Sequence, residues 1–301
     1  MYDVILLTEE QYQDRTAAPD DWYVNNLLTE DRLVQEALEK RGLKVRKVGW
    51  SNPTFDWTQA RVAVFRTTWD YFHRFEEFEA WLGRMEQLGL SFINPLGQIR
   101  WNQDKHYLKD LETQGIRITP THIIEPGTQT TLEALHQTLG WSHTVLKPAI
   151  SGAARHTYKL SPENRGEHEA PFQALVAKEA MLLQPFQNYV METGEVSLMV
   201  IGGKYTHAVL KVAKPGDFRV QDDFGGTLHP YTPTAAEVAF AERAVAACSP
   251  TPAYARVDVI YDNEGQLAVQ ELEMIEPELW FRRLPEAADR LAETIFNQLQ
   301  A

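Results

Sequence analysis

Cysteine is almost absent from this sequence. Cys248 is the single cysteine among 301 residues, so no disulfide can form within the chain. A reducing compartment is compatible with this composition. A small, buried, apolar side chain near a helix end is the favoured interpretation of Cys248, ahead of a catalytic thiol.

Long apolar runs are also missing. Residues 1–7 form a short apolar run with no basic segment before it, which does not fit a signal peptide. No segment approaches the ~20 apolar residues that a membrane helix needs. We therefore expect a cytoplasmic protein with no membrane partner.

Positive charge is scarce relative to negative charge. The chain carries 29 Lys and Arg against 42 Asp and Glu, a formal net charge of −13. Such a surface repels phosphate backbones, so we expect no nucleic-acid partner. No Gly-x-Gly-x-x-Gly follows the first predicted strand, which argues against a dehydrogenase. The negative net charge does not exclude a small anionic substrate, because a local cluster of basic residues can outweigh the average negative potential of the surface.

The sequence does contain an ordered series of strands and helices. Its 44% apolar and 24% charged residues are typical of a globular protein. The first third predicts a small open parallel sheet covered by helices. Its strands are expected at residues 4–7, 45–48 and 62–65, and its helices at 27–41 and 75–88. A turn cluster at 94–97 places a boundary near residue 98.

Beyond residue 98 the pattern favours antiparallel pairing. We expect helices at 103–114, 132–139, 235–247 and 287–299, and strands at 121–124, 144–146, 157–160, 181–184, 196–201, 205–212, 255–261 and 266–272. The predicted fold class is α/β (α+β). We predict three units: an N-terminal α/β substrate domain at 1–98, then α+β units at 99–190 and 191–301.

Three carboxylates are expected to meet on the last hairpin. Glu271 and Glu273 lie two apart on one strand, so alternation puts them on one face, and the hairpin brings Asp258 opposite them. Water or a hard cation must offset their mutual repulsion, and Mg²⁺ favours carboxylates together with nucleotide phosphates. A solvent-facing acidic strand is the alternative interpretation.

Two lysines and a loop of small residues form a second candidate site. Lys105 lies at a predicted helix start, and Lys147 ends a strand before Pro148. Ser151 and Gly152 lie in the following loop, 149–155, whose backbone N–H groups could approach phosphate oxygens. The loop is not a Walker motif, and either lysine alone could be a solvated surface charge.

A basic segment at 211–219 precedes a glycine pair at 225–226. Lys211 and Arg219 concentrate positive charge in an acidic protein. Arg219 could stabilise negative charge on a transferring phosphoryl or acyl-phosphate group. An ordinary basic loop is the alternative.

These motifs, in this order, resemble the ATP-grasp superfamily, with most similarity to its glutathione synthetase and RimK-type branch. The resemblance covers roughly residues 98–301. It implies that ATP lies between two antiparallel sheets, with Lys105, Lys147 and the loop of Ser151 and Gly152 around its phosphates, and with Lys211 as a further cofactor-binding residue. It also implies that Gln184 and Phe186 border the adenine and that Glu195 takes the ribose hydroxyls.

The same resemblance implies the catalytic centre. Asp258, Glu271 and Glu273 would bind two Mg²⁺ ions, with Mn²⁺ an alternative metal, and Arg219 would face the γ-phosphate. The family commonly has asparagine at the position of Glu273, so this site carries an extra negative charge. Arg256, two residues before Asp258, is a second anion contact.

The substrate is expected at the carboxyl ends of the N-terminal strands. Candidate contacts there are Arg66, Thr67, Trp69 and Asp70, with Glu276 following the metal strand. For Asp70 a helix cap, and for Trp69 a core position, are equally favoured alternatives. Segments 68–71 and 217–221 resemble an ATP-grasp group that includes D-cycloserine ligase, which implies a small amino-acid-derived substrate.

The predicted activity is an ATP-dependent ligase that joins a small-molecule carboxylate to an amine through an acyl phosphate. One alternative is RimK-like addition of an amino acid to a protein or cofactor. A nucleotide-binding module without turnover is another. No segment decides between a monomer and a homodimer.

Overall fold

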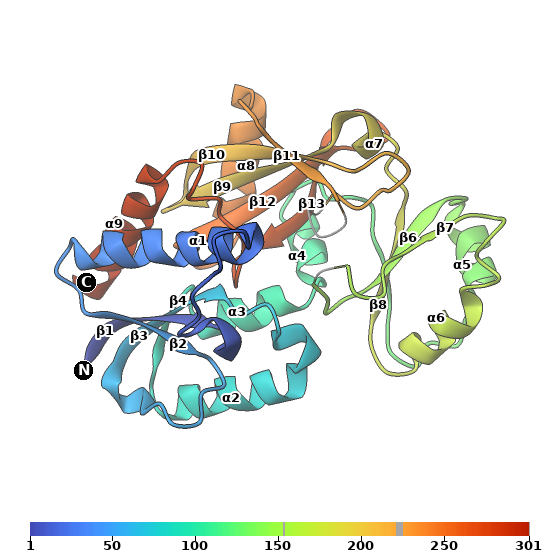
Figure 1. The fold of residues 1–301 in the computed structure, drawn as a ribbon. Coiled ribbons are helices and arrows are strands. Elements are labelled where there is room, and N and C mark those ends of the chain that lie inside the picture. The colour runs from blue at the N-terminus through green and yellow to red at the C-terminus, as the bar shows by residue number, and fades with distance from the viewer. Residues whose placement is uncertain (153, 221–224, 301) are drawn as a thin grey trace.

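Three separate sheets organise the chain (Figure 1). The computed structural model describes residues 1–152, 154–220 and 225–300. Ala153 and Gln221, which belong to two of the predicted segments, lie outside the described residues. The α/β class and the predicted division into parallel and antiparallel sheets are confirmed.

The first sheet is parallel and has the strand order β2-β1-β3-β4. Alternate residues of β1 enter two different apolar clusters: Val4 and Leu6 pack with α1, whereas Ile5 and Leu7 pack with α2. Its elements are β1 (Tyr2–Thr8), η1 (Glu10–Tyr12), α1 (Trp22–Glu39), β2 (Val45–Gly49), η2 (Trp57–Gln59), β3 (Ala60–Thr67), η3 (Tyr71–His73), α2 (Phe75–Gln87) and β4 (Ser91–Ile93). Burial on both faces explains why β1 reads as a continuous apolar run.

The second sheet is antiparallel, with the order β5-β8-β6-β7, and has its own apolar cluster. Helices α5 and α6 pack against it (Figure 1). The elements of this part are α3 (Leu96–Gln103), α4 (Tyr107–Thr113), β5 (His122–Ile124), α5 (Leu132–Leu139), β6 (Thr144–Pro148), β7 (Tyr158–Leu160), α6 (Glu169–Val176), β8 (Met181–Pro185) and α7 (Val190–Thr193).

The third sheet is also antiparallel and has the order β11-β10-β9-β12-β13. Gly202 and Gly203 join β9 to β10 with positive φ angles of 59° and 73°, as a tight hairpin turn requires. The elements are β9 (Glu195–Ile201), β10 (Lys204–Val212), β11 (Thr227–Pro230), α8 (Ala235–Ala246), β12 (Tyr254–Tyr261), β13 (Leu267–Glu273) and α9 (Glu286–Gln300).

One apolar cluster joins the first sheet to the third. Residues of β1 and α1 pack in it with residues of β9, β10 and α9, including Ile201 and Leu291. Helices α1 and α9 lie side by side in Figure 1. The predicted units at 1–98 and 191–301 therefore share a core, and the predicted boundary near residue 98 falls within α3.

Two predicted helix boundaries were wrong. Helix α1 begins at Trp22, five residues earlier than expected, because the Asp21 carboxylate caps it by accepting from the Val24 N–H. The helix expected at 103–114 is α4, which begins only at Tyr107, whereas α3 was not predicted and ends at Gln103, with extended backbone at Asp104 between the two. This break places Lys105 in a loop rather than on a helix.

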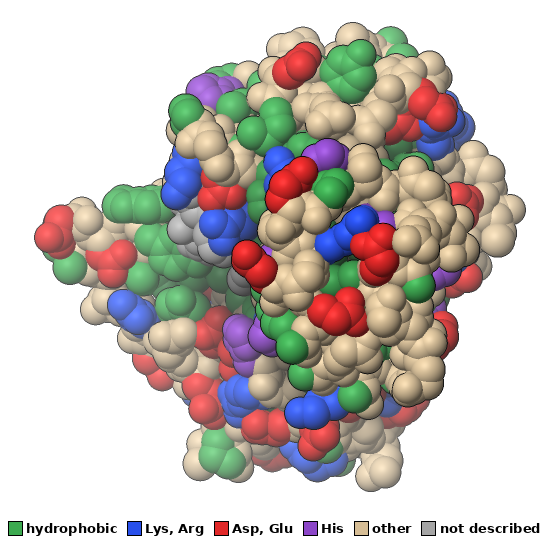
Figure 2. Space-filling view, turned by 90° about the vertical axis from the view of Figure 1, so that its right-hand side faces the viewer, with side chains coloured by type: hydrophobic (Ala, Val, Ile, Leu, Met, Phe, Trp, Pro, Cys, Tyr) green, Lys and Arg blue, Asp and Glu red, His purple; other side chains and the backbone are tan. Residues whose placement is uncertain are grey.

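The surface mixes both signs of charge. On the face drawn in Figure 2, acidic and basic side chains are interspersed, with apolar side chains between them. None of the described helices combines the length and the apolar character that crossing a membrane requires.

Candidate active site

A cavity of about 430 Å³ lies where the three sheets meet. Its volume is within the ~300–1,000 Å³ of small-molecule sites. The end of β3, the loop after β6, the strand β8 and the hairpin β12–β13 all contribute to its wall. Nearly all the side chains predicted for the site line this one cavity.

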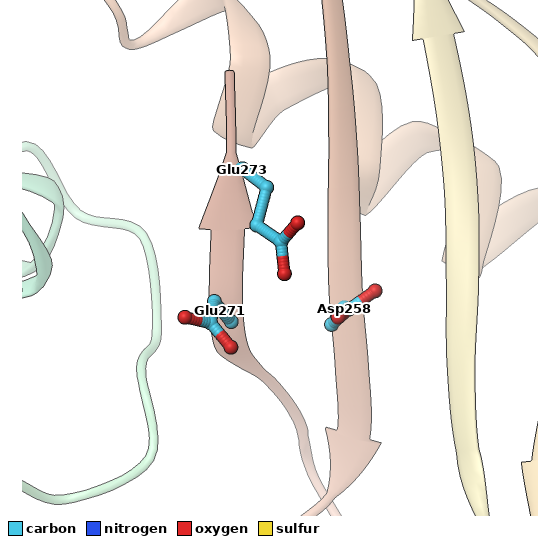
Figure 3. Close-up of side chains that lie close together, drawn as sticks. All are labelled: Asp258, Glu271 and Glu273. Atoms are coloured by element: carbon cyan, nitrogen blue, oxygen red, sulfur yellow. The ribbon is translucent and has the colours of Figure 1, made fainter. Parts of the chain in front are cut away.

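The three predicted carboxylates converge on the last hairpin (Figure 3). Asp258 lies directly opposite Glu271 in the strand register, and Arg256 lies opposite Glu273. One oxygen from each of the three carboxylates lies within 4.8 Å of the others. The predicted shared face is confirmed, and this donor set suits a hard cation such as Mg²⁺.

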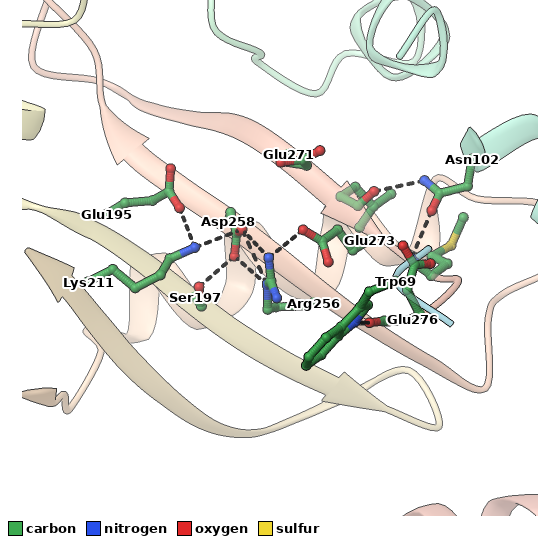
Figure 4. A network of polar contacts seen from close by, with 12 residues as sticks. Trp69, Asn102, Glu195, Ser197, Lys211, Arg256, Asp258, Glu271, Glu273 and Glu276 are labelled. Atoms are coloured by element: carbon green, nitrogen blue, oxygen red, sulfur yellow. Dashed lines mark hydrogen bonds and ion pairs between the residues drawn. The ribbon is translucent and has the colours of Figure 1, made fainter. Parts of the chain in front are cut away.

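Asp258 is already fully engaged by protein groups (Figure 4). Its Oδ1 accepts from the Ser197 hydroxyl at 2.6 Å, and its Oδ2 lies 3.0 Å from Lys211 Nζ. Arg256 contacts both oxygens. Burial alone would raise the pKa of Asp258, but Arg256 and Lys211 hold it well below its usual range.

The two glutamates each have one oxygen next to a cation. Glu271 Oε1 lies 3.0 Å from Lys105 Nζ, and Glu273 pairs with Arg256. Within the described residues, the second oxygen of each makes no ion pair or hydrogen bond. Burial raises the pKa of Glu273 to about 7 despite Arg256, whereas Lys105 and Lys147 outweigh burial and lower the pKa of Glu271. Each glutamate therefore has one oxygen that can bind a metal. Asp258 could bind the same metal only if Lys211 or Arg256 moved away from it.

Lys105 and Lys147 line the same cavity although they lie 42 positions apart in the sequence. Both are buried and line the cavity, and the Lys105 Nζ also donates to the Ser151 carbonyl at 2.7 Å. Burial lowers the pKa of Lys147, while Glu271 opposes that shift. The pair forms a cationic wall facing the carboxylates, which is the arrangement that a metal-bound polyphosphate requires.

Gly152 is fixed by contact with the N-terminal unit. A Cβ atom at this position would lie 2.5 Å from the Phe72 ring, closer than real Cβ contacts. Ser151, Gly152 and Phe72 all line the cavity. The lack of a side chain at Gly152, which was predicted to let phosphate approach the backbone, therefore also lets the loop after β6 pack against the N-terminal unit.

Gln184, on β8, and Phe186, just after it, line the part of the cavity that the second sheet contributes. The Gln184 Nε2 donates to Thr121 Oγ1 at 2.9 Å, while its buried Oε1 has no partner among the described residues. Lys159 Nζ lies 3.7 Å from the centroid of the Phe186 ring. An aromatic face and an unused buried acceptor suit a planar heterocycle with an amino group.

Two predicted residues have protein partners that their predicted roles did not anticipate. Glu195, expected near a ribose, pairs with Lys211 beside the carboxylate cluster. Arg219 lines the cavity and its guanidinium contacts Asp217 at 2.7 Å, which lowers the pKa of Asp217. The ribose role of Glu195 and the phosphate role of Arg219 stay predictions.

Four of the five predicted substrate residues line the cavity, namely Arg66, Thr67, Trp69 and Glu276. Asp70 does not: its carboxylate accepts from Trp50 Nε1 and from Arg74, each at 2.7 Å. Asp70 stands at the N-cap position of η3, but its side chain makes no capping hydrogen bond there.

Sequence reasoning missed a wall of the cavity and a support of the metal strand. The missed wall comes from the start of α1, where one helix face carries Trp22, Tyr23, Asn26 and Glu30. An earlier helix start, signalled by Asp21, would have found this face. The missed support is Asn102, whose side chain bonds both sides of Glu273: it donates to the Leu272 carbonyl and accepts from the Met274 N–H, each at 2.8 Å.

The comparisons with known proteins agree with this geometry. Residues 4–94 match the family described as the N-terminal domain of the D-cycloserine synthetase DcsG. Cycloserine biosynthesis protein DcsG of Streptomyces lavendulae is 28% identical over 310 residues, which cover 95% of this chain and 97% of that protein.

Solved structures share the whole architecture. The crystal structure of D-cycloserine synthetase DcsG superposes with a TM-score of 0.83 at 27% identity, covering 98% of this chain and 99% of that one. D-alanine–D-alanine ligase of Bacillus anthracis, complexed with ATP, superposes with a TM-score of 0.65 at 15% identity, covering 100% and 98% of the two chains. At that identity the second likeness establishes the fold alone, and the fold is the one that ATP-grasp enzymes have.

Proposed function

We propose that this chain, an ATP-grasp enzyme, is an ATP-dependent ligase that activates a small amino-acid-like carboxylate as an acyl phosphate and joins it to an amine. The observation that carries the proposal is the meeting of Asp258, Glu271 and Glu273 with Lys105 and Lys147 in one cavity. Opposed carboxylates and lysines of this kind suit a polyphosphate bridged by metal ions.

The nucleotide would lie along the cavity from Phe186 to the hairpin. Gln184 Oε1 would accept from the adenine amino group, which gives this buried oxygen the partner that it lacks. Lys105, Lys147 and the backbone around Gly152 would contact the phosphates. Glu195 remains a candidate for the ribose, provided that Lys211 releases it.

Glu271 and Glu273 would hold Mg²⁺, with Asp258 as a third ligand once Lys211 moves away from it. The metal would supply compensation for the negative charge on the phosphates. Arg256 pairs with both Asp258 and Glu273. It would therefore remain beside the reacting groups and stabilise the transferring phosphoryl group.

The chemistry needs positioning and charge compensation, with no protein nucleophile. A carboxylate oxygen of the substrate attacks the γ-phosphorus, the bond from that phosphorus to the β–γ bridging oxygen breaks, and ADP leaves. The amine then attacks the acyl carbon, the bond from carbon to the phosphate oxygen breaks, and phosphate leaves. The proton lost by the amine passes to the departing phosphate or to a nearby carboxylate.

Phosphate release from Mg·ATP, measured over a panel of amino acids and dipeptides, tests the proposal. We expect release that depends on a particular amino acid and that falls at least ~100-fold in Glu271→Gln, because this change removes one metal ligand charge. Circular dichroism and urea unfolding of both proteins serve as the folding control. Tight ATP binding with no substrate-dependent release over the whole panel would contradict the proposal and favour a nucleotide-binding module.

A further inference from the structure

Arg66 is a buried cation with unused hydrogen-bond donors. Its side chain is 1% exposed, yet it lines the cavity, and its Nε and Nη1 have no hydrogen-bond partner among the described residues. Its nearest carboxylate is Asp31, at 4.0 Å from Nε, which is beyond hydrogen-bond distance. Asp31 and the Phe281 ring, 5.4 Å from the guanidinium carbon, compensate part of its charge, but two buried N–H donors are left without an acceptor in the described part of the chain. Unused buried donors are unfavourable unless a ligand supplies the acceptor.

Glu276 is a carboxylate of opposite sign in the same part of the cavity. Within the described residues it has no cationic side chain within 4.0 Å, in contrast to Glu271 and Glu273. Burial first, and then Glu273, raise the pKa of Glu276 well above its usual range. A cation from outside the protein would complete the site and keep this carboxylate ionised.

The backbone holds Arg66 and Glu276 near each other. The Tyr254 hydroxyl contacts the Phe65 carbonyl at 3.1 Å and the Ile275 carbonyl at 2.8 Å, the residues immediately before the two charges. Trp69 Nε1 donates to the Glu276 carbonyl at 2.9 Å (Figure 4). These contacts fix the two segments, although Arg66 and Glu276 form no ion pair with each other.

The neighbouring charges of this region are already satisfied. Glu30 accepts from the Phe281 and Arg282 backbone N–H groups and pairs with the Arg282 guanidinium at 3.0 Å. Arg282 also pairs with Glu278. Arg66, with two unused hydrogen-bond donors, and Glu276, with no cation within 4.0 Å among the described residues, are therefore two opposite charges of this region that a ligand can complete.

We propose that Arg66 and Glu276 together select a zwitterionic substrate, with the Arg66 guanidinium binding a carboxylate and the Glu276 carboxylate binding an ammonium group. The proposal rests on the proposed ligase function and names the recognition elements of its substrate site. A free amino acid carries both charges, whereas an N-acylated or amidated derivative lacks one of them. A site built for charged hydrogen bonds rejects such derivatives, because a buried charge is then left unpaired.

Binding of free and blocked amino acids tests this inference. The protein with Mg·ADP is titrated with L- and D-amino acids, and the tightest of them is compared with its N-acetyl and carboxamide derivatives. We expect each derivative to bind at least ~10-fold more weakly than the free amino acid. Glu276→Gln should remove the preference over the N-acetyl form, and Arg66→Gln the preference over the carboxamide.

Two controls keep the test decisive. Glu293→Gln, at an exposed position on α9, changes the net charge by the same amount as Glu276→Gln. It should keep the preference for the free amino acid over both derivatives. Arg66→Lys keeps the charge and should retain part of the carboxylate preference if Arg66→Gln does not fold. Equal binding of free and blocked forms, an unchanged preference in Glu276→Gln, or no binding of any free amino acid would overturn the inference. Because binding needs no turnover, a failure of the ligase proposal would be seen separately, as absent phosphate release.

Discussion

Buried charges set the properties of individual residues throughout this protein. Around the hairpin, Asp258 is held ionised by two cations, whereas Glu273 is only partly compensated by Arg256. A single additional carboxylate in such a cluster is tolerated when a metal or a ligand supplies the missing positive charge. The charge of Glu273 therefore fits a site that works with its cations bound.

Asp31 should make stability fall as pH rises through the mildly acidic range. Burial raises its pKa to about 6, although Arg66 and Lys47 oppose the shift. Because the folded protein then holds a proton that the unfolded chain has released, this contribution is full below about pH 4 and lost by about pH 6. From this shift we expect a contribution of about 3 kcal/mol.

Urea unfolding at a series of pH values checks this expectation. Asp31→Asn should flatten the dependence between about pH 4 and pH 6. The expectation is contradicted if the free energy of unfolding of the wild-type protein stays constant or rises across this interval, with the same slope against pH as that of the variant. Asp31 would then titrate normally.

Among the secondary-structure elements, the β12–β13 hairpin is held in place by the side chains of two asparagines. Asn94, with φ of 59°, donates to the Tyr254 and Met274 carbonyls and accepts from the Ala253 N–H. Asn102 bonds the backbone on both sides of Glu273 in the same way. Each side chain thus takes the place of a neighbouring strand where the hairpin reaches the cavity.

Asn102→Ala should lower both stability and metal affinity. The change leaves the buried Leu272 carbonyl and Met274 N–H without partners, for which we expect a loss of about 2–4 kcal/mol in the free energy of unfolding. Urea unfolding measures the loss, and the Mg²⁺ dependence of nucleotide binding reports the displaced Glu273. Asn297→Ala, at an exposed position on α9, is the matched control. Full stability in Asn102→Ala would contradict this role.

The contact between Gly152 and Phe72 should couple the loop after β6 to the first unit. In Gly152→Ala the new methyl group meets the Phe72 ring, so the loop must shift, and we expect about a 10-fold loss of nucleotide affinity. Phe72→Leu in the same chain should restore much of it, because the smaller side chain makes room. Calorimetric titration of ADP measures both, and equal affinity in wild type and Gly152→Ala would refute the coupling.

The elements that were predicted correctly are those with a local signal. The apolar alternation of β12 and β13 and the turn at 262–265 gave the register that places Asp258 opposite Glu271. The contacts of Asn102 with Leu272 and of Glu30 with Phe281 join residues 170 and 251 positions apart. No local pattern encodes such contacts, because a buried side chain satisfies distant backbone groups only after the sheets have packed.

In the whole molecule, the first and last parts of the chain pack together, although the middle part lies between them in the sequence. The first and third sheets share one apolar cluster, whereas the second sheet has a cluster of its own. Among the described residues, the second sheet contributes only Leu182 of β8, with Ala149 after β6, to a cluster with the third sheet. The lysines and the aromatic end of the cavity belong largely to the second unit, and the carboxylates to the third. A nucleotide in this cavity would therefore connect two units that share only a few of the described core residues.

Hydrogen exchange should reveal this division. Without nucleotide, amides in β5, β6 and β8 should exchange faster than those in β1 and β9, because the smaller cluster opens more readily. Mg·ADP should slow exchange in the second unit more than in the shared core. Uniform exchange in both regions, unchanged by nucleotide, would show that the chain opens as a single unit.

Transfer of a labelled oxygen tests the ligase account most directly. The amino acid that supports phosphate release is prepared with heavy oxygen in its carboxylate, and the released phosphate is examined by mass spectrometry. Attack of the carboxylate on the γ-phosphorus followed by cleavage at carbon predicts one labelled oxygen in each phosphate. Unlabelled phosphate would mean that water, not the substrate carboxylate, attacks ATP, and it would contradict the acyl-phosphate mechanism.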